Sequence, residues 1–109
     1  MQPFTERVVK VIQAIPEGYV MTYGQIAAEA GSPRGARQVV RILHAMSEKH
    51  HLPWHRVVNA RGEIAIQEEE GRYMQTLSLR NEGIHVDGQG RVDLNVCRFI
   101  PDGEAFLLE

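Results

Sequence analysis

The spacing of hydrophobic residues at the start of the chain predicts a helix. Apolar positions recur there at intervals of three and four residues, which places them on one helical face, and they are Val8, Val9, Val11, Ile12 and Ile15. Thr5 has the residue type of an N-cap for this helix. Pro16-Glu17-Gly18 is typical of a turn that ends it. Tyr19-Val20-Met21 is expected to be a short extended segment.

Two further helices are predicted close together. Thr22 and Gln25 have the spacing of a capping box, so a short helix begins there, and Gly31 is suited to end it. Ser32 and Pro33 then have the residue types of an N-cap and a first helical position, which predicts the start of a second helix. Two helices joined by so tight a turn predict a helix-turn-helix.

The second of these helices separates apolar from basic residues. Its core-facing positions are predicted to be Ala36, Val39, Val40 and Leu43. Another face carries Arg34, Arg37, Arg41 and His44. From Arg34 to Arg61 six basic residues stand against Glu48 alone, although the whole chain has a net charge of −2. A solvated helix face is the plainer alternative, but the lack of interleaved acids favours a surface that faces nucleic-acid phosphates.

The middle of the chain predicts a loop followed by a β-hairpin. Residues 47–52 are polar and are expected to form the loop, and Pro53 then leads into residues 54–58. A turn at residues 59–62, followed by alternating residues at 63–66, predicts a hairpin or wing. The hairpin and the helix-turn-helix together predict a mainly α-helical α+β domain of winged-helix type.

The last third of the chain has a weaker pattern. Residues 71–81 predict another helix, which Glu82-Gly83 closes. His85-Val86 and residues 92–94 are expected to be short strands. Residues 95–109 have too little pattern for a prediction.

Length and composition predict one domain over residues 1–109. Hydrophobic residues make up 43% of the chain, which is typical of a globular protein. No apolar run approaches the ~20 residues that span a bilayer, and the first residues lack the features of an export signal. The single cysteine, Cys97, excludes an internal disulfide and is consistent with a reducing compartment. A cytoplasmic location is therefore expected.

Metal, cofactor and thiol chemistry have little support in the sequence. The histidines that could suggest a metal site are His50, His51 and His55. Pro53 interrupts any helix that would align them, and no cysteine or acidic residue follows closely. Cys97 lies in an apolar stretch, so a small buried side chain is expected. We expect no metal and no cofactor.

Three segments of the chain resemble a known family. They are Thr22-Tyr23-Gly24-Gln25-Ile26-Ala27, Ala36-Arg37-Gln38-Val39-Val40 and Pro53-Trp54-His55-Arg56. Together they resemble the DNA-binding domain of the O6-alkylguanine-DNA alkyltransferases, over about residues 4–88. In that family the third segment is Pro-Cys-His-Arg, and the cysteine thiolate accepts the alkyl group. The indole of Trp54 has one N–H donor and no nucleophilic lone pair. The chain is therefore most similar to the alkyltransferase-like proteins, which keep the damage-reading site and lack the acceptor.

The resemblance implies roles for four residues at the lesion. Tyr23 would help to rotate the target nucleotide out of the duplex and hydrogen-bond the flipped base. Arg37 would occupy the space that the base leaves, in a helix presented to the minor groove. Trp54 would line the pocket beside the O6-alkyl group, with a core aromatic as the alternative. The carbonyls of Trp54 and Val57 would accept from the guanine amino group.

The same resemblance assigns the remaining site residues. In the transferases a Gly-rich loop around a Tyr-Ser pair covers the alkyl group. The stretch from Ile66 to Gly71 departs from that pattern here, and it is expected to contact the lesion through Gln67 and Glu68. Contacts to the DNA backbone are expected from Arg34, Gly35, Ala36, Arg41 and His44. Residues that activate the thiol in the family have no thiol to activate here. They would instead form a polar network that braces the pocket, made of His55, Arg56 and Glu82.

These assignments predict a non-enzymatic, monomeric sensor of DNA damage. It would bind double-stranded DNA, flip O6-alkylguanine, and leave removal of the lesion to nucleotide excision repair, the partner that the resemblance implies. The alternative is a sequence-specific winged-helix regulator that ignores alkylation. An enzyme that uses Cys97 is a third and weaker reading.

Overall fold

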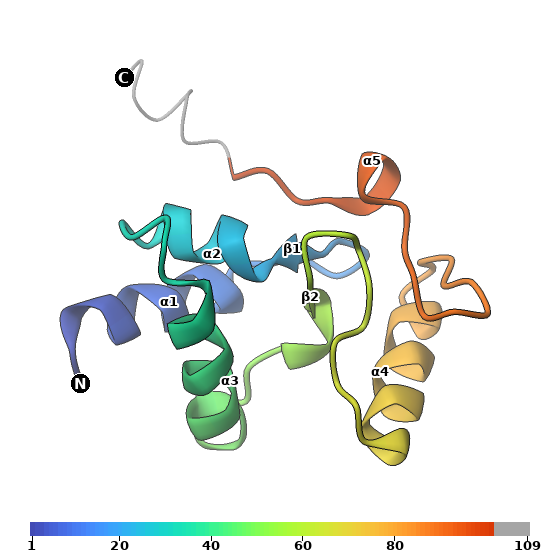
Figure 1. Cartoon of the computed structure of the whole chain (residues 1–109), viewed down its shortest axis with the longest axis horizontal. Coiled ribbons are helices and arrows are strands. Elements are labelled where there is room, and N and C mark those ends of the chain that lie inside the picture. Colours follow the sequence, from blue (N-terminus) through green and yellow to red (C-terminus); the bar gives the residue numbers. More distant parts are fainter. Residues whose placement is uncertain (102–109) are drawn as a thin grey trace.

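The structure is a computed structural model that describes residues 1–101. Its elements are α1 (Pro3–Gln13), β1 (Met21–Thr22), α2 (Tyr23–Glu29), α3 (Ala36–His50), the 3-10 turn η1 (Trp54–Arg56), β2 (Val57–Val58), α4 (Glu69–Asn81) and α5 (Leu94–Cys97). In Figure 1, β1 and β2 lie between the group formed by α1, α2 and α3 and the separate helix α4. The predicted fold class, mainly α with a small amount of β, is confirmed.

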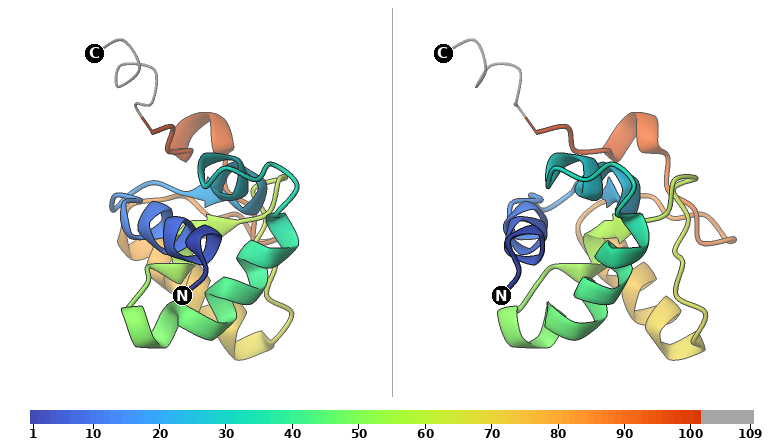
Figure 2. Two further views of the ribbon diagram at one scale, coloured as in Figure 1. Left: turned by 90° about the vertical axis from the view of Figure 1, so that its left-hand side faces the viewer. Right: turned by 60° about the vertical axis from the view of Figure 1, so that its left-hand side comes forward.

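Two hydrophobic clusters hold these elements together. The first lies among α1, α2 and α3 and is centred on Val8, Ile12, Ile26, Val39 and Leu43. The second lies between the β2 side of the molecule and α4, and comprises Val20, Val58, Ile64, Leu79, Ile84, Val86, Val92 and Cys97. The turned views in Figure 2 show α1 nearly end-on while α3 runs across it, so these two helices cross steeply. The first cluster thus fixes the position of α3.

Helix α1 begins earlier than its sequence predicts. Its N-cap is Gln2 and Pro3 is the first helical residue, so Thr5 lies inside the helix and does not cap it. The physical reason is that the fixed φ of proline suits the first helical position, where no N–H is needed. The apolar stripe is confirmed in its most buried members, Val8 and Ile12, which are both fully buried.

The turn between α2 and α3 confirms one capping prediction and corrects another. Thr22 and Gln25 form both hydrogen bonds of the predicted capping box, at 3.1 and 3.2 Å. Gly31, with φ of 99°, follows the end of α2 as predicted. Ser32 does not cap α3, because its carbonyl accepts from the N–H of Gly35 at 2.8 Å and closes a turn instead. Helix α3 therefore starts later than predicted.

Gly35 is the N-cap of α3, and a close contact requires a glycine there. A Cβ at this position would lie 2.9 Å from the ring of Phe4 and 3.1 Å from the carbonyl oxygen of Ser32. Both distances are shorter than van der Waals contact. The packing of α1 against this turn, which is a contact between distant parts of the chain, therefore decides where α3 begins.

Helix α3 also ends later than predicted. The sequence predicts a polar loop over residues 47–52, but the helix continues to His50, and His51 in the left-handed conformation ends it. Inside the helix the hydroxyl of Ser47 donates to the carbonyl of Leu43 at 2.5 Å. This back-bond satisfies a serine within a helix, where it otherwise competes for backbone groups.

The predicted hairpin is wrong. β2 pairs in parallel with β1, with Met21 opposite Val57 and Thr22 opposite Val58. The two strands are joined through α2 and α3, which a parallel pair requires because a tight turn cannot connect it. Residues 63–66 form no strand, and Glu63 makes only a single bridge to Arg91.

The last part of the described chain also differs from its prediction. Helix α4 begins at Glu69, capped by the side chain of Glu68, and ends as predicted. The short strands predicted at 85–86 and 92–94 are absent from the described residues. Instead α5 begins at Leu94, with Asp93 as its N-cap. Residues 102–109 of the tail lie outside the described residues.

Candidate functional site

The basic residues predicted on α3 are exposed. Arg34 lies in the turn before the helix, and Arg37, Arg41 and His44 follow along it, all exposed. Within residues 1–101 the side chains of Arg37 and Arg41 take part in no hydrogen bond or ion pair. An unpaired row of guanidinium groups on one helix face is available for phosphates. Gly35 and Ala36, the other predicted backbone contacts, form the start of the same helix.

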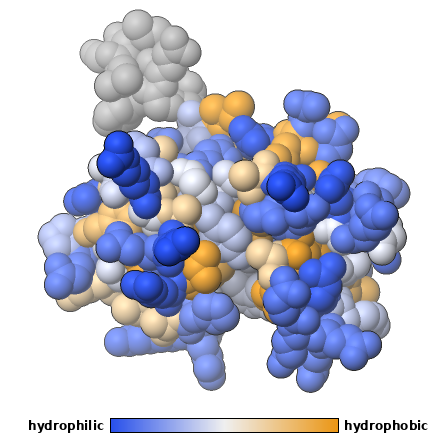
Figure 3. Space-filling model, in the orientation of Figure 1, coloured by the Kyte–Doolittle hydropathy of each residue, from blue (hydrophilic) through white to orange (hydrophobic). Residues whose placement is uncertain are grey.

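A pocket of about 260 Å³ lies next to this basic face. One wall is a stripe of α3 at helical spacing, made of Val40, Leu43, His44, Ser47 and Glu48. The other walls are Tyr23, Trp54, Val57, Ile66 and Gln75. In Figure 3 hydrophilic side chains cover the two lobes of the molecule, and hydrophobic surface is visible in the hollow between them.

The faces of α3 differ from the prediction at two of the four expected core positions, because Ala36 and Val40 are only half-buried. Val39 and Leu43 are buried as predicted, and Ile42 joins them. Val40, predicted to face the core, is only half-buried and lines the pocket. The helix therefore has three faces, toward the core, the pocket and solvent.

Tyr23 and Trp54 lie on the same pocket although they are distant in sequence. Tyr23 is the first residue of α2, held there by the capping box, and Trp54 begins η1. Both are half-buried and pack against the first hydrophobic cluster. Burial raises the pKa of Tyr23, so its hydroxyl keeps its proton and remains a hydrogen-bond donor. The sequence allowed Trp54 to be either a pocket residue or a core aromatic. In the structure it packs against the core and also lines the pocket.

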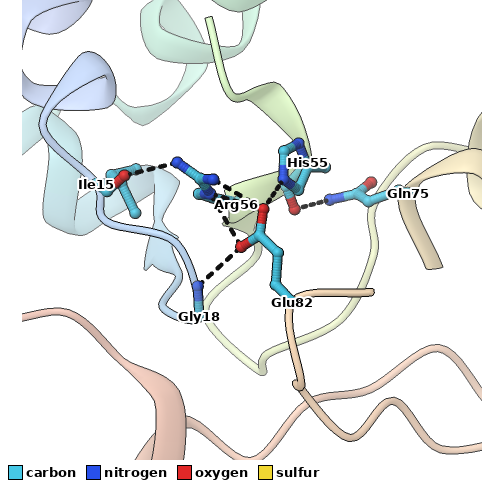
Figure 4. Close-up of polar contacts among 6 residues, drawn as sticks. All are labelled: Ile15, Gly18, His55, Arg56, Gln75 and Glu82. Atoms are coloured by element: carbon cyan, nitrogen blue, oxygen red, sulfur yellow. Dashed lines mark hydrogen bonds and ion pairs between the residues drawn. The ribbon is translucent and has the colours of Figure 1, made fainter. Parts of the chain in front are cut away.

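Glu82 is the centre of the polar network, which Figure 4 shows in close-up. Its carboxylate accepts from Arg56 Nη2 at 2.8 Å and from the backbone N–H of Gly18 at 2.8 Å, and lies 2.5 Å from His55 Nε2. Arg56 also donates to the carbonyl oxygen of Ile15 at 2.9 Å. The predicted grouping of His55, Arg56 and Glu82 is thus present in the structure, and it reaches the end of α1.

The ionisation of Glu82 follows from these contacts. Burial by itself would raise the pKa of this carboxyl group, whose side chain is 9% exposed. Hydrogen bonds from Arg56, from the Gly18 N–H and from His55 outweigh that effect and lower the pKa to about 2. Glu82 is therefore ionised at neutral pH, and its oxygens are engaged as acceptors.

Gln75 of α4 is a pocket residue that the sequence did not indicate. Its side chain is 1% exposed. Its Nε2 donates to the carbonyl oxygens of His55 at 3.0 Å and Val57 at 2.9 Å. Gln75 therefore holds the segment that carries Trp54 and occupies one acceptor position of the Val57 carbonyl. A lone glutamine on a polar helix gives no periodic signal that could have identified it.

Gln67 and Glu68 do not line the pocket. Gln67 Nε2 donates to the carbonyl of Ala65 at 3.3 Å, and the Glu68 carboxylate accepts from the N–H of Gly71 at 2.9 Å. Ile66 is the residue of this loop that lines the pocket. Glu68 is therefore the N-cap of α4.

Cys97 lies apart from the pocket that Trp54 lines. It is 5% exposed, belongs to the second hydrophobic cluster, and its thiol donates to the carbonyl of Asp93 at 3.3 Å. Burial raises the pKa of the Cys97 thiol, which disfavours the nucleophilic thiolate. Among residues 1–101 no group of three or more histidine, cysteine or acidic side chains is placed to hold a metal ion.

None of the helices within residues 1–101 is both long enough and apolar enough to span a bilayer.

Known proteins match most of the chain. Residues 3–84 match the family model described as 6-O-methylguanine DNA methyltransferase, DNA binding domain. A DNA base-flipping protein of Escherichia coli (strain K12) is 47% identical over 96 residues, which cover 88% of this chain and 74% of that protein. Alkyltransferase-like protein 1 of Schizosaccharomyces pombe is 38% identical over 103 residues, which cover 92% of this chain and 95% of that protein.

A solved structure also matches the fold. The crystal structure of S. pombe Atl1 in complex with damaged DNA containing O6-carboxymethylguanine matches with a TM-score of 0.80 and 34% identity, and the match covers 93% of this chain and 98% of that chain. The family resemblance that the three sequence segments predicted is confirmed.

Proposed function

The chain belongs to the family of the 6-O-methylguanine DNA methyltransferase DNA-binding domain, and from this premise we propose that it is a sensor of alkylated DNA that transfers no alkyl group. It binds duplex DNA through the basic face of α3. It turns an O6-alkylguanine out of the duplex and holds the base in the pocket between Tyr23 and Trp54. Because its partner is duplex DNA, we also propose that the protein is located at the chromosome.

One observation carries this proposal: Trp54 lines a pocket that lies directly beside an unpaired basic face. Phosphate contacts position a protein on DNA without reading its sequence. A concave, mainly apolar pocket next to them suits an extruded base, which loses its stacking partners and needs new apolar contacts. The indole face of Trp54 supplies such contacts and is not altered by the alkyl group.

Arg37 and Tyr23 have different parts in base flipping under this proposal. Arg37 is exposed at the start of α3 with no partner among the described residues. Its planar guanidinium can stack between bases and hydrogen-bond the orphaned partner base, which offsets part of the cost of unstacking. Tyr23, kept protonated, donates to the extruded base from the pocket wall.

The proposal assigns no acceptor for the alkyl group. The position that would carry the acceptor is Trp54, and the one cysteine of the chain is buried in a different cluster with a raised pKa. Since the lesion is held and not repaired, other proteins must remove it. We include in the proposal that nucleotide excision repair takes over the marked site.

A titration with matched duplexes tests the proposal. Duplexes with and without a single O6-methylguanine are placed in several flanking sequences, and binding is measured at a fixed, stated salt concentration because phosphate contacts make affinity salt-dependent. We expect a preference for the lesion in every flank. A preference for one flank that is indifferent to alkylation would instead establish a sequence-specific regulator.

A further inference from the structure

Beside the donors of Tyr23 and Trp54, the pocket lining includes three hydrogen-bond acceptors. Glu48 contributes a carboxylate, and Gln75 contributes an amide oxygen whose N–H groups already serve two backbone carbonyls. The hydroxyl proton of Ser47 is donated within α3, so its oxygen is left as an acceptor. No lysine or arginine among the described residues lines the pocket, and His44 is its single basic side chain. Glu48 is the one acidic side chain among the described residues that line the pocket.

Glu48 lies at one end of the pocket. The pocket stripe of α3 runs from Val40 to Glu48, a span of about 12 Å at the helical rise of 1.5 Å per residue. Arg37 precedes this stripe, so Glu48 is at the end of the pocket farthest from the residue that we assign to the base stack. A substituent that extends from the purine ring toward this end of the pocket would approach Glu48.

The carboxylate of Glu48 has no structural role that accounts for it. Its side chain is exposed and forms no hydrogen bond or ion pair with the described residues. It lies in the last turn of α3, where a negative charge opposes the helix dipole. Replacing it with glutamine removes that unfavourable charge, so the variant is expected to fold.

We propose that Glu48 is a specificity-determining residue that makes the pocket accept neutral or cationic O6-substituents and disfavour anionic ones. The inference rests on the proposed function of the pocket. A carboxylate on an adduct that reaches this end of the pocket would approach the carboxylate of Glu48, and no lysine or arginine among the described lining residues offsets the repulsion. Selectivity of this kind is a difference between two affinities and needs only the unfavourable contact.

Two adducts of nearly equal size and different charge test the proposal. Duplexes contain O6-carboxymethylguanine, which is anionic, or O6-carbamoylmethylguanine, its neutral amide. Affinities for both, for O6-methylguanine and for the unmodified duplex are measured at low salt and at about pH 8, above the usual range of histidine titration. The wild type is compared with Glu48→Gln and Glu48→Lys. Glu29→Gln is the matched control, because Glu29 is an exposed acid on α2 that does not line the pocket.

The expected result is a charge preference that depends on Glu48 alone. The wild type and Glu29→Gln should bind the amide adduct about five- to tenfold more tightly than the acid, and added salt should narrow this ratio. Glu48→Gln should reduce the ratio to about twofold or less, and Glu48→Lys should favour the acid. Circular dichroism verifies that each variant is folded.

Three outcomes would overturn the proposal. The first is the same ratio in the wild type and in Glu48→Gln, and the second is an equal change in affinity for every duplex, which would make Glu48 a general electrostatic residue. Either leaves the preference for O6-methylguanine, and with it the proposed function, intact. The third is a wild type that binds no alkylated duplex better than the unmodified one, which would overturn both.

Discussion

Removing the charge of Glu82 should cost the protein stability in a way that depends on pH. Glu82→Gln keeps the shape of the side chain and removes the carboxylate that Arg56, His55 and the Gly18 N–H share. At neutral pH we expect the variant to be less stable than the wild type by about 2–3 kcal/mol. The loss arises because the Arg56 guanidinium, whose side chain is 17% exposed, keeps no ionised partner.

The magnitude follows from the pKa of Glu82. That pKa falls from the ordinary value of 4.5 to about 2 in the folded protein, and each unit corresponds to about 1.4 kcal/mol. The full linkage contribution is therefore about 3 kcal/mol. The Glu82 side chain is 9% exposed, so solvent screening reduces this only slightly. The glutamine amide oxygen still accepts one hydrogen bond, which accounts for the lower end of the expected range.

The dependence on pH has a definite sign. Because the folded-state pKa of Glu82 lies below its unfolded value, the carboxylate stabilises the fold fully above the unfolded value of 4.5. As the pH falls from there toward about 2, the unfolded chain takes up a proton first and the contribution is lost. By about pH 3 roughly three-fifths of it should be gone. The stability difference between wild type and Glu82→Gln should narrow over this range.

Urea unfolding followed by circular dichroism measures this difference at several pH values between about 7 and 3. Glu63→Gln is the matched control, because Glu63 also pairs with an arginine, Arg91, whose side chain is 50% exposed. An exposed pair of that kind contributes little, so its variant should remain close to the wild type. A difference for Glu82→Gln that is absent at neutral pH, or that stays constant down to pH 3, would refute the reasoning.

Four further results are expected. Incubation with O6-methylguanine DNA should leave the intact mass of the protein unchanged, and a stoichiometric gain of one methyl group, located at Cys97 or elsewhere, would contradict the sensor. Arg41→Ala should weaken binding to normal and alkylated duplexes about equally and lower the salt dependence, whereas Arg37→Ala should weaken lesion binding more; equal losses in titrations at each salt would make Arg37 a phosphate contact. Trp54→Ala should reduce lesion affinity by ~1–3 kcal/mol with the domain still folded in thermal melting, and an undiminished lesion preference would exclude Trp54 from the pocket. Gln75→Leu should lower the free energy of unfolding by about 1–3 kcal/mol, because two buried carbonyls lose their donor, and unchanged urea unfolding would show that those carbonyls find other partners.

The sequence correctly predicted those parts of the fold that depend on residues close together in the chain. The capping box of Thr22 and Gln25 is read from two residues three positions apart, and its geometry is present in full. Ser32 and Pro33 carry an equally strong local signal for a helix start, yet the helix begins at Ala36. The approach of Phe4 to Gly35 decides between the two, and no window of local sequence contains that contact.

Pairing between distant segments was the main source of error. The sequence at residues 57–66 predicts a hairpin because its two apolar segments flank a turn. Val57 and Val58 instead pair with β1, far upstream, and this buries both of them. A single sequence contains no information on which of several apolar segments a short strand will join.

The candidate site was predicted where a motif exists and missed where only packing defines it. His55, Arg56 and Glu82 were grouped from the family resemblance, and they are in contact in the structure. Gln75 and Glu48 had no motif. Glu48 was assigned to a polar loop, and the extra turns of α3 bring it to the pocket.

The polar network of His55, Arg56 and Glu82 has a structural role that does not depend on activating a thiol. Arg56 donates to the carbonyl of Ile15, two residues after α1 ends, and Glu82 accepts from the N–H of Gly18 in the following turn. These bonds connect η1, the end of α4 and the end of α1, so they hold the wall that carries Trp54 whether or not a proton is ever transferred. Removing Arg56 or Glu82 would leave the other partly buried charge without its ion-pair partner, which is costly. Under the proposed function, in which Trp54 stands at the acceptor position, the network therefore keeps its structural role without any alkyl transfer.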